Sequence, residues 1–208
     1  MQLGIRNEEL GMKKIVLASK NLDKVKEIRL VLKNLPLEIL SLAEFDNLPD
    51  AVEDGATFEE NALIKAKFFR ELTNFACLAD DSGLEVDALG GLPGVHSARF
   101  AGYHADDKTN NQKLLDELKK IGVTESVAAY RCALAFVDID GTEFLTEGKI
   151  AGKIKTVAKG NGGFGYDPYF YIDDRRTMAQ ISVDEKNLIS HRGAALKEMV
   201  LKLKEKFL

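Results

Sequence analysis

The 208-residue chain is poor in the residues that mark several classes of protein. It has two cysteines and three histidines, and neither set shows the spacing of a zinc site. Cys77 and Cys132 both lie in apolar stretches, so we expect two reduced thiols in the core. Structural zinc and a disulfide framework are therefore not predicted.

The chain also lacks long apolar runs and an excess of positive charge. No window of about 18 apolar residues is present, so no membrane-spanning helix is predicted, and no secretory signal is visible. The formal net charge is −4, whereas proteins that grip nucleic-acid polymers usually carry a basic excess. We therefore expect a cytoplasmic protein without a nucleic-acid polymer or a membrane as partner, although a small basic pocket for a mononucleotide remains possible.

Familiar catalytic signatures are missing as well. The sequence contains neither a P-loop nor a Gly-x-Ser-x-Gly elbow. Residues 160–165 match Gly-x-Gly-x-x-Gly, but Tyr-Asp-Pro follows, and Pro168 disfavours helix at Asp167. Because the dinucleotide fingerprint must open a helix, we reject that interpretation.

The composition is that of a globular protein, with 45% hydrophobic and 30% charged residues, and the length suffices for a real core. We expect a single domain over residues 12–208. Residues 1–11 are interpreted as a short disordered extension or the product of an upstream start codon.

Apolar periodicity and turn signals predict the secondary structure. The predicted strands cover residues 15–18, 37–40, 77–79, 84–87, 127–139, 142–150 and 169–171. The predicted helices cover residues 22–34, 57–72, 106–120 and 190–204. Thr57 and Glu60 have the spacing of a capping box, and Asp140-Gly141 is a hairpin turn signal. A βαβ start followed by a hairpin-rich section favours an α/β fold with a mixed sheet.

Two segments carry the residue types of a phosphate and metal site. Residues 19–24 (Ser-Lys-Asn-Leu-Asp-Lys) lie between a strand and a helix N-terminus, where backbone amides bind phosphate; Ser19 and Asn21 add hydrogen bonds and Lys24 adds charge. Asp80 and Asp81 follow a buried strand, where one carboxylate could hold Mg²⁺ and the other take a proton from water. The alternatives are an ordinary helix cap and an Asp-Ser-Gly turn.

Two later segments fit recognition of a nucleotide. The loop 160–168 presents Phe164 and Tyr166 beside Asp167, so it could stack on a base, or it could be a plain hairpin loop. His191 and Arg192 fall in the first turn of the last helix, where cations oppose the helix dipole unless they serve an anion or an acceptor. The alternative there is a solvated helix start.

Two further pieces of sequence leave their roles open. Asn61 and Lys65 share one helix face, and Arg99 lies in a glycine-rich loop, where it could clamp a triphosphate. Each could equally belong to a structural ion pair. His96 and His104 are interpreted as ordinary loop residues.

Taken together, these segments resemble one family, the inosine/xanthosine triphosphate pyrophosphatases, from about Lys13 to Lys204. The resemblance is carried by residues 19–24, 57–62, 79–84, 90–100, 162–168 and 190–193 in this order. It implies a mixed α/β fold, with an elongated twisted sheet flanked by helices and two lobes around a cleft. It also implies a homodimer and Mg²⁺-dependent hydrolysis of ITP, dITP and XTP to the monophosphate and pyrophosphate.

The resemblance also implies residue roles. Asp81 resembles the proton acceptor and a magnesium ligand. The residues that resemble substrate contacts are Ser19, Lys20, Asn21, Leu22, Asp23, Lys24, Ser82, Phe164, Gly165, Tyr166, Asp167, Lys186, His191 and Arg192. Val52 departs from the family pattern, because many relatives have there the glutamate assigned to the metal, and Glu53 follows it. His96 stands where tyrosine is common.

Two alternative functions stay open at this point. A pyrophosphatase for pyrimidine or modified nucleotides, as in the related septum-inhibitor-like family, would differ in its substrate panel. A non-catalytic nucleotide-binding protein would bind ITP without turnover, and loss of the paired carboxylates would indicate it.

Overall fold

The computed structural model describes residues 13–208, so the expected extension at residues 1–11 lies outside the described residues. The elements are β1 (Lys13–Ala18), α1 (Leu22–Leu32), β2 (Leu37–Ser41), η1 (Leu42–Glu44), α2 (Phe58–Thr73), β3 (Ala76–Val86), η2 (Asp87–Leu89), η3 (Gly94–Arg99), α3 (Asp107–Lys120), β4 (Glu125–Val137), β5 (Glu143–Lys155), β6 (Phe170–Tyr171), η4 (Met178–Gln180), α4 (Val183–Ile189) and α5 (His191–Phe207). The η elements are single 3₁₀ turns or short 3₁₀ helices.

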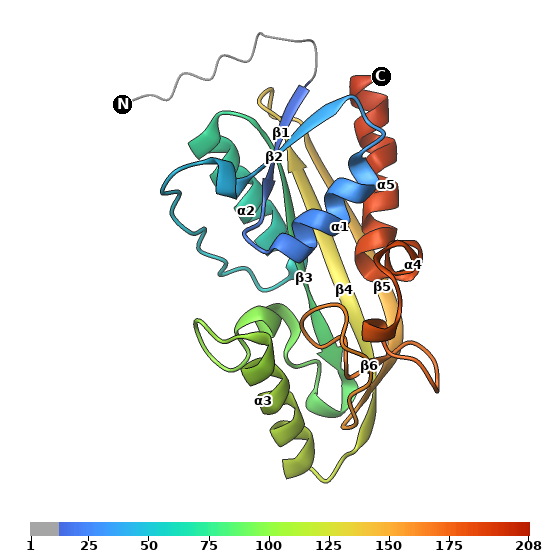
Figure 1. Cartoon of the computed structure of the whole chain (residues 1–208). Coiled ribbons are helices and arrows are strands. Elements are labelled where there is room, and N and C mark those ends of the chain that lie inside the picture. Colours follow the sequence, from blue (N-terminus) through green and yellow to red (C-terminus); the bar gives the residue numbers. More distant parts are fainter. Residues whose placement is uncertain (1–12) are drawn as a thin grey trace.

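The strands form one mixed sheet in the order β2-β1-β3-β4-β5-β6. β1 pairs in parallel with β2 and β3, while β3, β4, β5 and β6 pair antiparallel in sequence order. The three long strands β3, β4 and β5 run the length of the molecule, and helices flank them (Figure 1). The expected mixed α/β class is confirmed, and its parallel part consists of the βαβ unit formed by residues 13–41 together with the first residues of β3.

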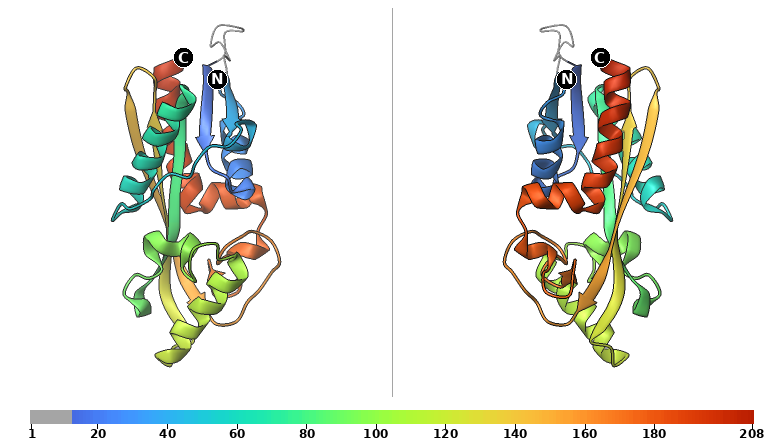
Figure 2. Two further views of the ribbon diagram at one scale, coloured as in Figure 1. Left: turned by 90° about the vertical axis from the view of Figure 1, so that its left-hand side faces the viewer. Right: turned by 90° about the vertical axis from the view of Figure 1, so that its right-hand side faces the viewer.

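Helices cover both faces of the sheet at one end of the long strands. α1 and α5 pack on one face, where Ile15 and Leu17 meet Ile28 and Met199 in an apolar cluster. α2 covers the other face, and the side views show it across the strands from α1 (Figure 2). A separate cluster at the opposite end joins α3 to the far halves of β3 and β4 and to the loop before β6. The two-lobe and single-domain descriptions stay predictions; the observation is one sheet with apolar cores at both ends.

One prediction about the sheet is wrong. The two aspartates were expected to end a strand after Ala79, but β3 continues through Asp80–Gly83, paired residue by residue with β4. A strand tolerates a buried carboxylate when cations satisfy it, and Asp80 has two such partners. The turn interpretation of residues 80–83 is therefore excluded.

Smaller differences from the predictions have local causes. Thr57 caps α2 as expected, accepting from the Glu60 amide, but the Glu60 carboxylate accepts from the amide of Ala56 instead of Thr57. β5 runs five residues beyond the expected end because its far half pairs with both β4 and β6. α4 was not predicted, since its seven residues show too few turns for a clear period. Within residues 13–208, no helix combines the length and apolarity that crossing a membrane requires.

Candidate active site

The register of the parallel strands brings two predicted segments together. Ala18, the last residue of β1, pairs with Ala79 in β3, so residues 19–24 leave the sheet beside residues 80–82. Asn21 caps α1 by accepting from the amides of residues 23 and 24, and Ser19 Oγ accepts from the amide of residue 21. The helix cap that was the alternative interpretation of this segment is therefore present, and it lies beside the carboxylates.

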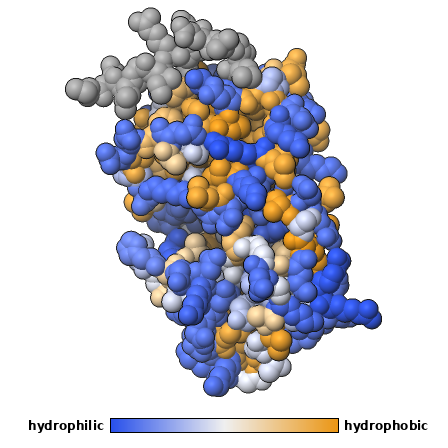
Figure 3. All heavy atoms as spheres, viewed as in Figure 1, coloured by the Kyte–Doolittle hydropathy of each residue, from blue (hydrophilic) through white to orange (hydrophobic). Residues whose placement is uncertain are grey.

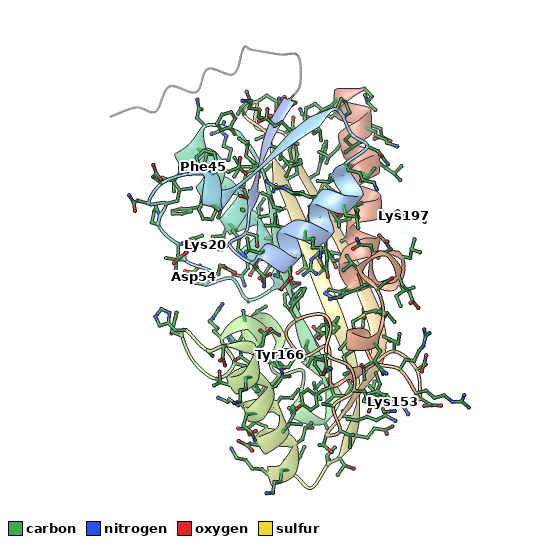
Figure 4. The ribbon with its side chains drawn as sticks, viewed as in Figure 1. Lys20, Phe45, Asp54, Lys153, Tyr166 and Lys197 are labelled. Carbon is green, nitrogen blue, oxygen red and sulfur yellow. The ribbon has the colours of Figure 1, made fainter. Side chains whose placement is uncertain are left out.

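A hollow opens next to this junction. It is lined by Asn21, Lys24, Ser82, Gly83, Ser97, Ala98, Asp107, Asn110, Tyr130, Phe164, Gly165, Tyr166, Asp167, Lys186, His191 and Arg192. The space-filling view shows a notch with hydrophilic side chains at this level of the molecule (Figure 3). Lys20 and Asp54 lie on the other side of the narrow middle of the molecule from Tyr166 (Figure 4). The lining residues come from both ends of the molecule, for example Lys24 from α1 and Asn110 from α3.

Ten of the fifteen predicted site residues line this hollow, and five do not. Lys20 points to the surface and pairs with Asp50 at 2.7 Å, and Leu22 is 72% exposed. Asp23 lines a second hollow, which shares Phe164 and Lys186 with the first. Ser19 is used in the α1 cap, and Asp81 points away from the hollow for the reason that follows.

Asp80 is fully buried and accepts four hydrogen bonds. They come from Lys24 Nζ (2.5 Å), Arg192 Nε (2.9 Å), Ser82 Oγ (3.1 Å) and Cys132 Sγ (3.1 Å). Burial alone would raise the pKa of Asp80, but the Arg192 guanidinium and the Lys24 ammonium hold it well below its usual range. Asp80 is thus an ionised carboxylate that orients two cations and has no free capacity as a base.

A series of buried ion pairs, called the ion-pair chain below, extends away from Asp80. Arg192 also binds Glu27, Glu27 binds Lys186 at 3.0 Å, and Lys186 binds Asp167 at 2.7 Å. The Tyr130 hydroxyl donates to Asp167 at 3.2 Å and ends the chain. Buried charges persist only when paired in this way, so the ion-pair chain holds Lys186 of α4 and Arg192 of α5 in fixed positions along the hollow.

Aromatic rings lie against the same cations. The Phe164 ring centre is 4.3 Å from Lys186 Nζ and 5.6 Å from Arg192 Cζ. His191 stacks on Tyr130 with ring centres 4.7 Å apart, and its buried Nδ1 has no hydrogen-bond partner among the described residues. Burial, with the Arg192 charge next, lowers the pKa of His191 well below its usual range, so the imidazole is neutral. This end of the hollow offers flat rings together with fixed donors.

The start of α5 owes its place to close backbone packing. Ser190 caps the helix by accepting from the amide of Gly193. At Gly148 in β5, a Cβ would overlap the carbonyl oxygen of His191. The absence of a side chain at residue 148 therefore lets the helix start, with its imidazole and guanidinium, approach the sheet.

Asp81 points to the opposite face of β3 from Asp80, because neighbouring side chains alternate along a strand. Lys65 on α2 lies between Asp81 (3.7 Å) and Glu53 (2.9 Å), and its ammonium also donates to the backbone oxygen of Asp80. Burial raises the pKa of Asp81 to about 6 despite the attraction of Lys65. Asp81 is therefore a carboxyl whose pKa suits proton transfer near neutral pH.

The donor set around Asp81 fits a divalent cation that also binds substrate phosphate. Asp81 Oδ2 is buried and has no hydrogen-bond partner among residues 13–208. The second carboxylate is that of Glu53, which binds the same Lys65 ammonium. The described residues contain no cluster of three or more metal-binding side chains. One or two carboxylates completed by phosphate and water are the usual protein share of a Mg²⁺ site. Val52, at the position of a common family acid, is 74% exposed and carries no ligand atom.

Several residues of the site were missed or left open by the sequence. Lys65 was not predicted to be a site residue, although its i, i+4 spacing with Asn61 on α2 is a sequence signal for a shared helix face. Glu27 and Tyr130 had no signal, because an acid in a helix and a tyrosine in a strand are ordinary. Arg99 donates to the backbone oxygen of Glu53 at 3.1 Å, which gives it a structural role, and clamping of a triphosphate stays a hypothesis.

Comparisons with known proteins match almost the whole chain. The Ham1 family model matches residues 15–202. A dITP/XTP pyrophosphatase of Geobacter sulfurreducens is 46% identical over 186 residues, which cover 89% of this chain and 94% of that protein. A protein of the same name from Clostridium perfringens is 48% identical over 200 residues, covering 93% and 98%.

Solved structures agree with these relatives. A HAM1 protein from Coxiella burnetii superposes with a TM-score of 0.83 at 39% identity, covering 93% of this chain and all of that one. A nucleoside-triphosphatase / dITP/XTP pyrophosphatase from Mycobacterium abscessus gives a TM-score of 0.70 at 43% identity, covering 89% and 98%. The family match, these identities and the shared fold together show that the chain belongs to the Ham1 family.

Proposed function

We propose that this protein hydrolyses non-standard purine nucleoside triphosphates (ITP, dITP and XTP) to the nucleoside monophosphate and pyrophosphate. The observation that carries the proposal is the hollow itself. It has aromatic rings and fixed donors at one end, and beside its other end, on the opposite face of β3, lies the buried carboxyl of Asp81 with a raised pKa. The names of the relatives, dITP/XTP pyrophosphatase, support the same substrates.

The chemistry assigned to Asp81 is removal of a proton from the attacking water. The water oxygen forms a bond to the α-phosphorus, and the bond from that phosphorus to the α,β-bridging oxygen breaks. Pyrophosphate leaves with the electron pair of the broken bond, and the water proton goes to the carboxylate of Asp81. Lys65 holds that carboxylate in place, while Lys24 and Arg192 lie where phosphate charge would be neutralised.

Recognition of the base is assigned to the other end of the hollow. The 6-oxo group of hypoxanthine or xanthine accepts hydrogen bonds, and adenine presents a donor at that position. Lys186 and Arg192 are cationic donors fixed by buried carboxylates, and Phe164 offers a face on which the base can stack. A base that cannot accept would leave the remaining N–H groups of these cations, those not bound to the carboxylates, without an acceptor, which gives selectivity against ATP.

We further propose Mg²⁺ as the cofactor, held by Asp81 with Glu53, where it would neutralise phosphate charge. Among the residues that resemble the family's substrate contacts, those that line the hollow would contact the nucleotide directly. The remaining four, Ser19, Lys20, Leu22 and Asp23, would act indirectly, through the conformation of the start of α1. A homodimer and a cytoplasmic location are proposed with the family, since nucleotide pools are the substrate.

A steady-state assay across ITP, dITP, XTP, ATP, GTP and pyrimidine triphosphates tests the proposal, with pyrophosphate and phosphate measured separately. The expected result is pyrophosphate release from dITP with Mg²⁺, far faster than from dATP or dGTP. Phosphate as the primary product would refute the mechanism, and a preference for pyrimidines would support the septum-inhibitor-like alternative. Binding of ITP without turnover would indicate a non-catalytic protein.

A further inference from the structure

Two side chains of α3 hold one residue of the loop that carries Phe164. The Gly165 amide donates to Asp107 Oδ2 at 2.6 Å, and Asn111 Nδ2 donates to the Gly165 carbonyl oxygen at 2.8 Å. Asp107 and Asn111 are one turn apart, so they face the loop together. We call Asp107, Asn111 and Gly165 the Gly165 clamp.

The held residue lies outside the helices and strands, so individual contacts must fix its backbone. Gly165 has a φ of +61°, in the left-handed region, and it lies in an irregular stretch between β5 and β6. Two hydrogen bonds join its neighbour Phe164 to Asp167: the Phe164 amide donates to Asp167 Oδ2 at 3.0 Å, and the Phe164 carbonyl oxygen accepts from the Asp167 amide at 3.3 Å. On the α3 side, the clamp supplies the two hydrogen bonds next to the ring.

The hydrogen bonds of both clamp side chains go to the loop and not to their own helix. Asp106, not Asp107, is the N-cap of α3, and it accepts from the Thr109 amide at 2.8 Å. Asparagine is a weak helix former within a helix, and the buried Oδ1 of Asn111 has no hydrogen-bond partner among the described residues. Both side chains therefore serve the loop.

We propose that Asp107 and Asn111 are positioning residues for base recognition: by fixing Gly165 they hold the Phe164 ring against Lys186 and Arg192. This inference rests on the proposed function, in which the base stacks on that ring. Fixing the ring before the substrate arrives removes an ordering cost from binding. The reacting phosphate lies toward Asp81, so loss of the clamp affects binding of the base rather than the chemical step.

The test compares Asp107→Ala and Asn111→Ala with the matched control Asp106→Ala on the same helix start. Loss of one hydrogen bond, to a charged group in the case of Asp107, should raise KM for dITP and Kd for dIMP roughly tenfold, with kcat changed less than about twofold. The ratio of kcat/KM for dITP to kcat/KM for dGTP should fall, because the base that makes the best contacts with the Phe164 ring loses most binding free energy. Asp107→Asn, whose amide oxygen can still accept, should restore part of the loss.

Two control readouts separate positioning from folding. Asp106→Ala should lower the melting temperature and leave KM and selectivity as in the wild type. Inhibition by inorganic tripolyphosphate, which lacks a base, should be equal in wild type and Asp107→Ala. The inference is overturned if both clamp variants match Asp106→Ala in KM, Kd and selectivity. It is also overturned if tripolyphosphate inhibition weakens as much as dIMP binding. A wild type without preference for dITP would instead refute the proposed function, and the dIMP measurement by calorimetry would still decide the clamp.

Discussion

Replacing Asp81 by asparagine should abolish most turnover and at the same time make the protein more stable. Burial raises the pKa of Asp81 from about 3.8 to about 6, so the folded state disfavours the ionised carboxylate that neutral pH imposes. At about 1.4 kcal/mol per pH unit, the difference between these two pKa values corresponds to roughly 3 kcal/mol of destabilisation above pH 6. Asparagine lacks the charge and avoids this cost.

Because the pKa of Asp81 is raised on folding, the stability gain of Asp81→Asn depends on pH. Below the unfolded pKa of Asp81 both states are protonated, so the variant and the wild type should unfold alike near pH 3.5. The gain of Asp81→Asn should grow between the two pKa values and become constant above the folded one. At pH 7.5 in EDTA, about 3 kcal/mol corresponds to a melting temperature roughly 6–12 °C higher for a chain of this size.

Thermal and urea unfolding from pH 3.5 to 8, in EDTA and in Mg²⁺, would measure the gain. Added Mg²⁺ should stabilise the wild type and leave the variant unchanged, because the variant lacks the charged ligand. A variant less stable than the wild type at pH 7.5 in EDTA would refute the reasoning, since the buried carboxylate would then be supported rather than costly. Near-wild-type turnover would remove Asp81 from its proposed role.

Three further substitutions test the surroundings of the site. Lys65→Met should raise the pKa of Asp81 further, because Lys65 is its main attractive partner, and a pH profile of kcat/KM should show the acidic limb moved to higher pH. Arg192→Met leaves two buried carboxylates without their shared cation and should cost about 3–5 kcal/mol in urea unfolding; a loss below about 1 kcal/mol would contradict this. Gly148→Ala should cost about 1–3 kcal/mol by overlap with the His191 carbonyl and lower kcat/KM for dITP, and unchanged kinetics would show that the helix start tolerates displacement.

Much of the fold could be predicted from local sequence. The βαβ unit, the Asp140-Gly141 hairpin and the caps at Thr57 and Ser190 depend on residues close together in the chain, and the structure contains all of them. The ending of the strand at Asp80 could not be predicted correctly. The cations that satisfy that carboxylate come from α1 and α5, 56 and 112 residues away, and no local pattern reveals them.

The site shows the same division. Residues 19–24, the loop at residues 160–168 and the start of α5 were recognisable because polar or glycine residues lie there at the ends of apolar elements. Glu27 was not recognisable, because a glutamate on an amphipathic helix is usually solvated, and only tertiary packing buries it between Lys186 and Arg192. The separate orientations of Asp80 and Asp81 follow from strand geometry, but only once the strand is known to continue.

The continuity of β3, β4 and β5 has a consequence for how a nucleotide enters. These strands, of 11, 13 and 13 residues, pass from one end of the molecule to the other through the level of the hollow. In binding proteins whose two domains close over a ligand, the rotation takes place at a few linker residues outside any sheet. Here any rotation of the two ends of the molecule must bend the hydrogen-bonded strands β3, β4 and β5. Motion should therefore be elastic and small, so the radius of gyration in solution scattering should change little when nucleotide binds. Access and escape would then depend on side chains and loops at the rim, such as the one that α3 holds.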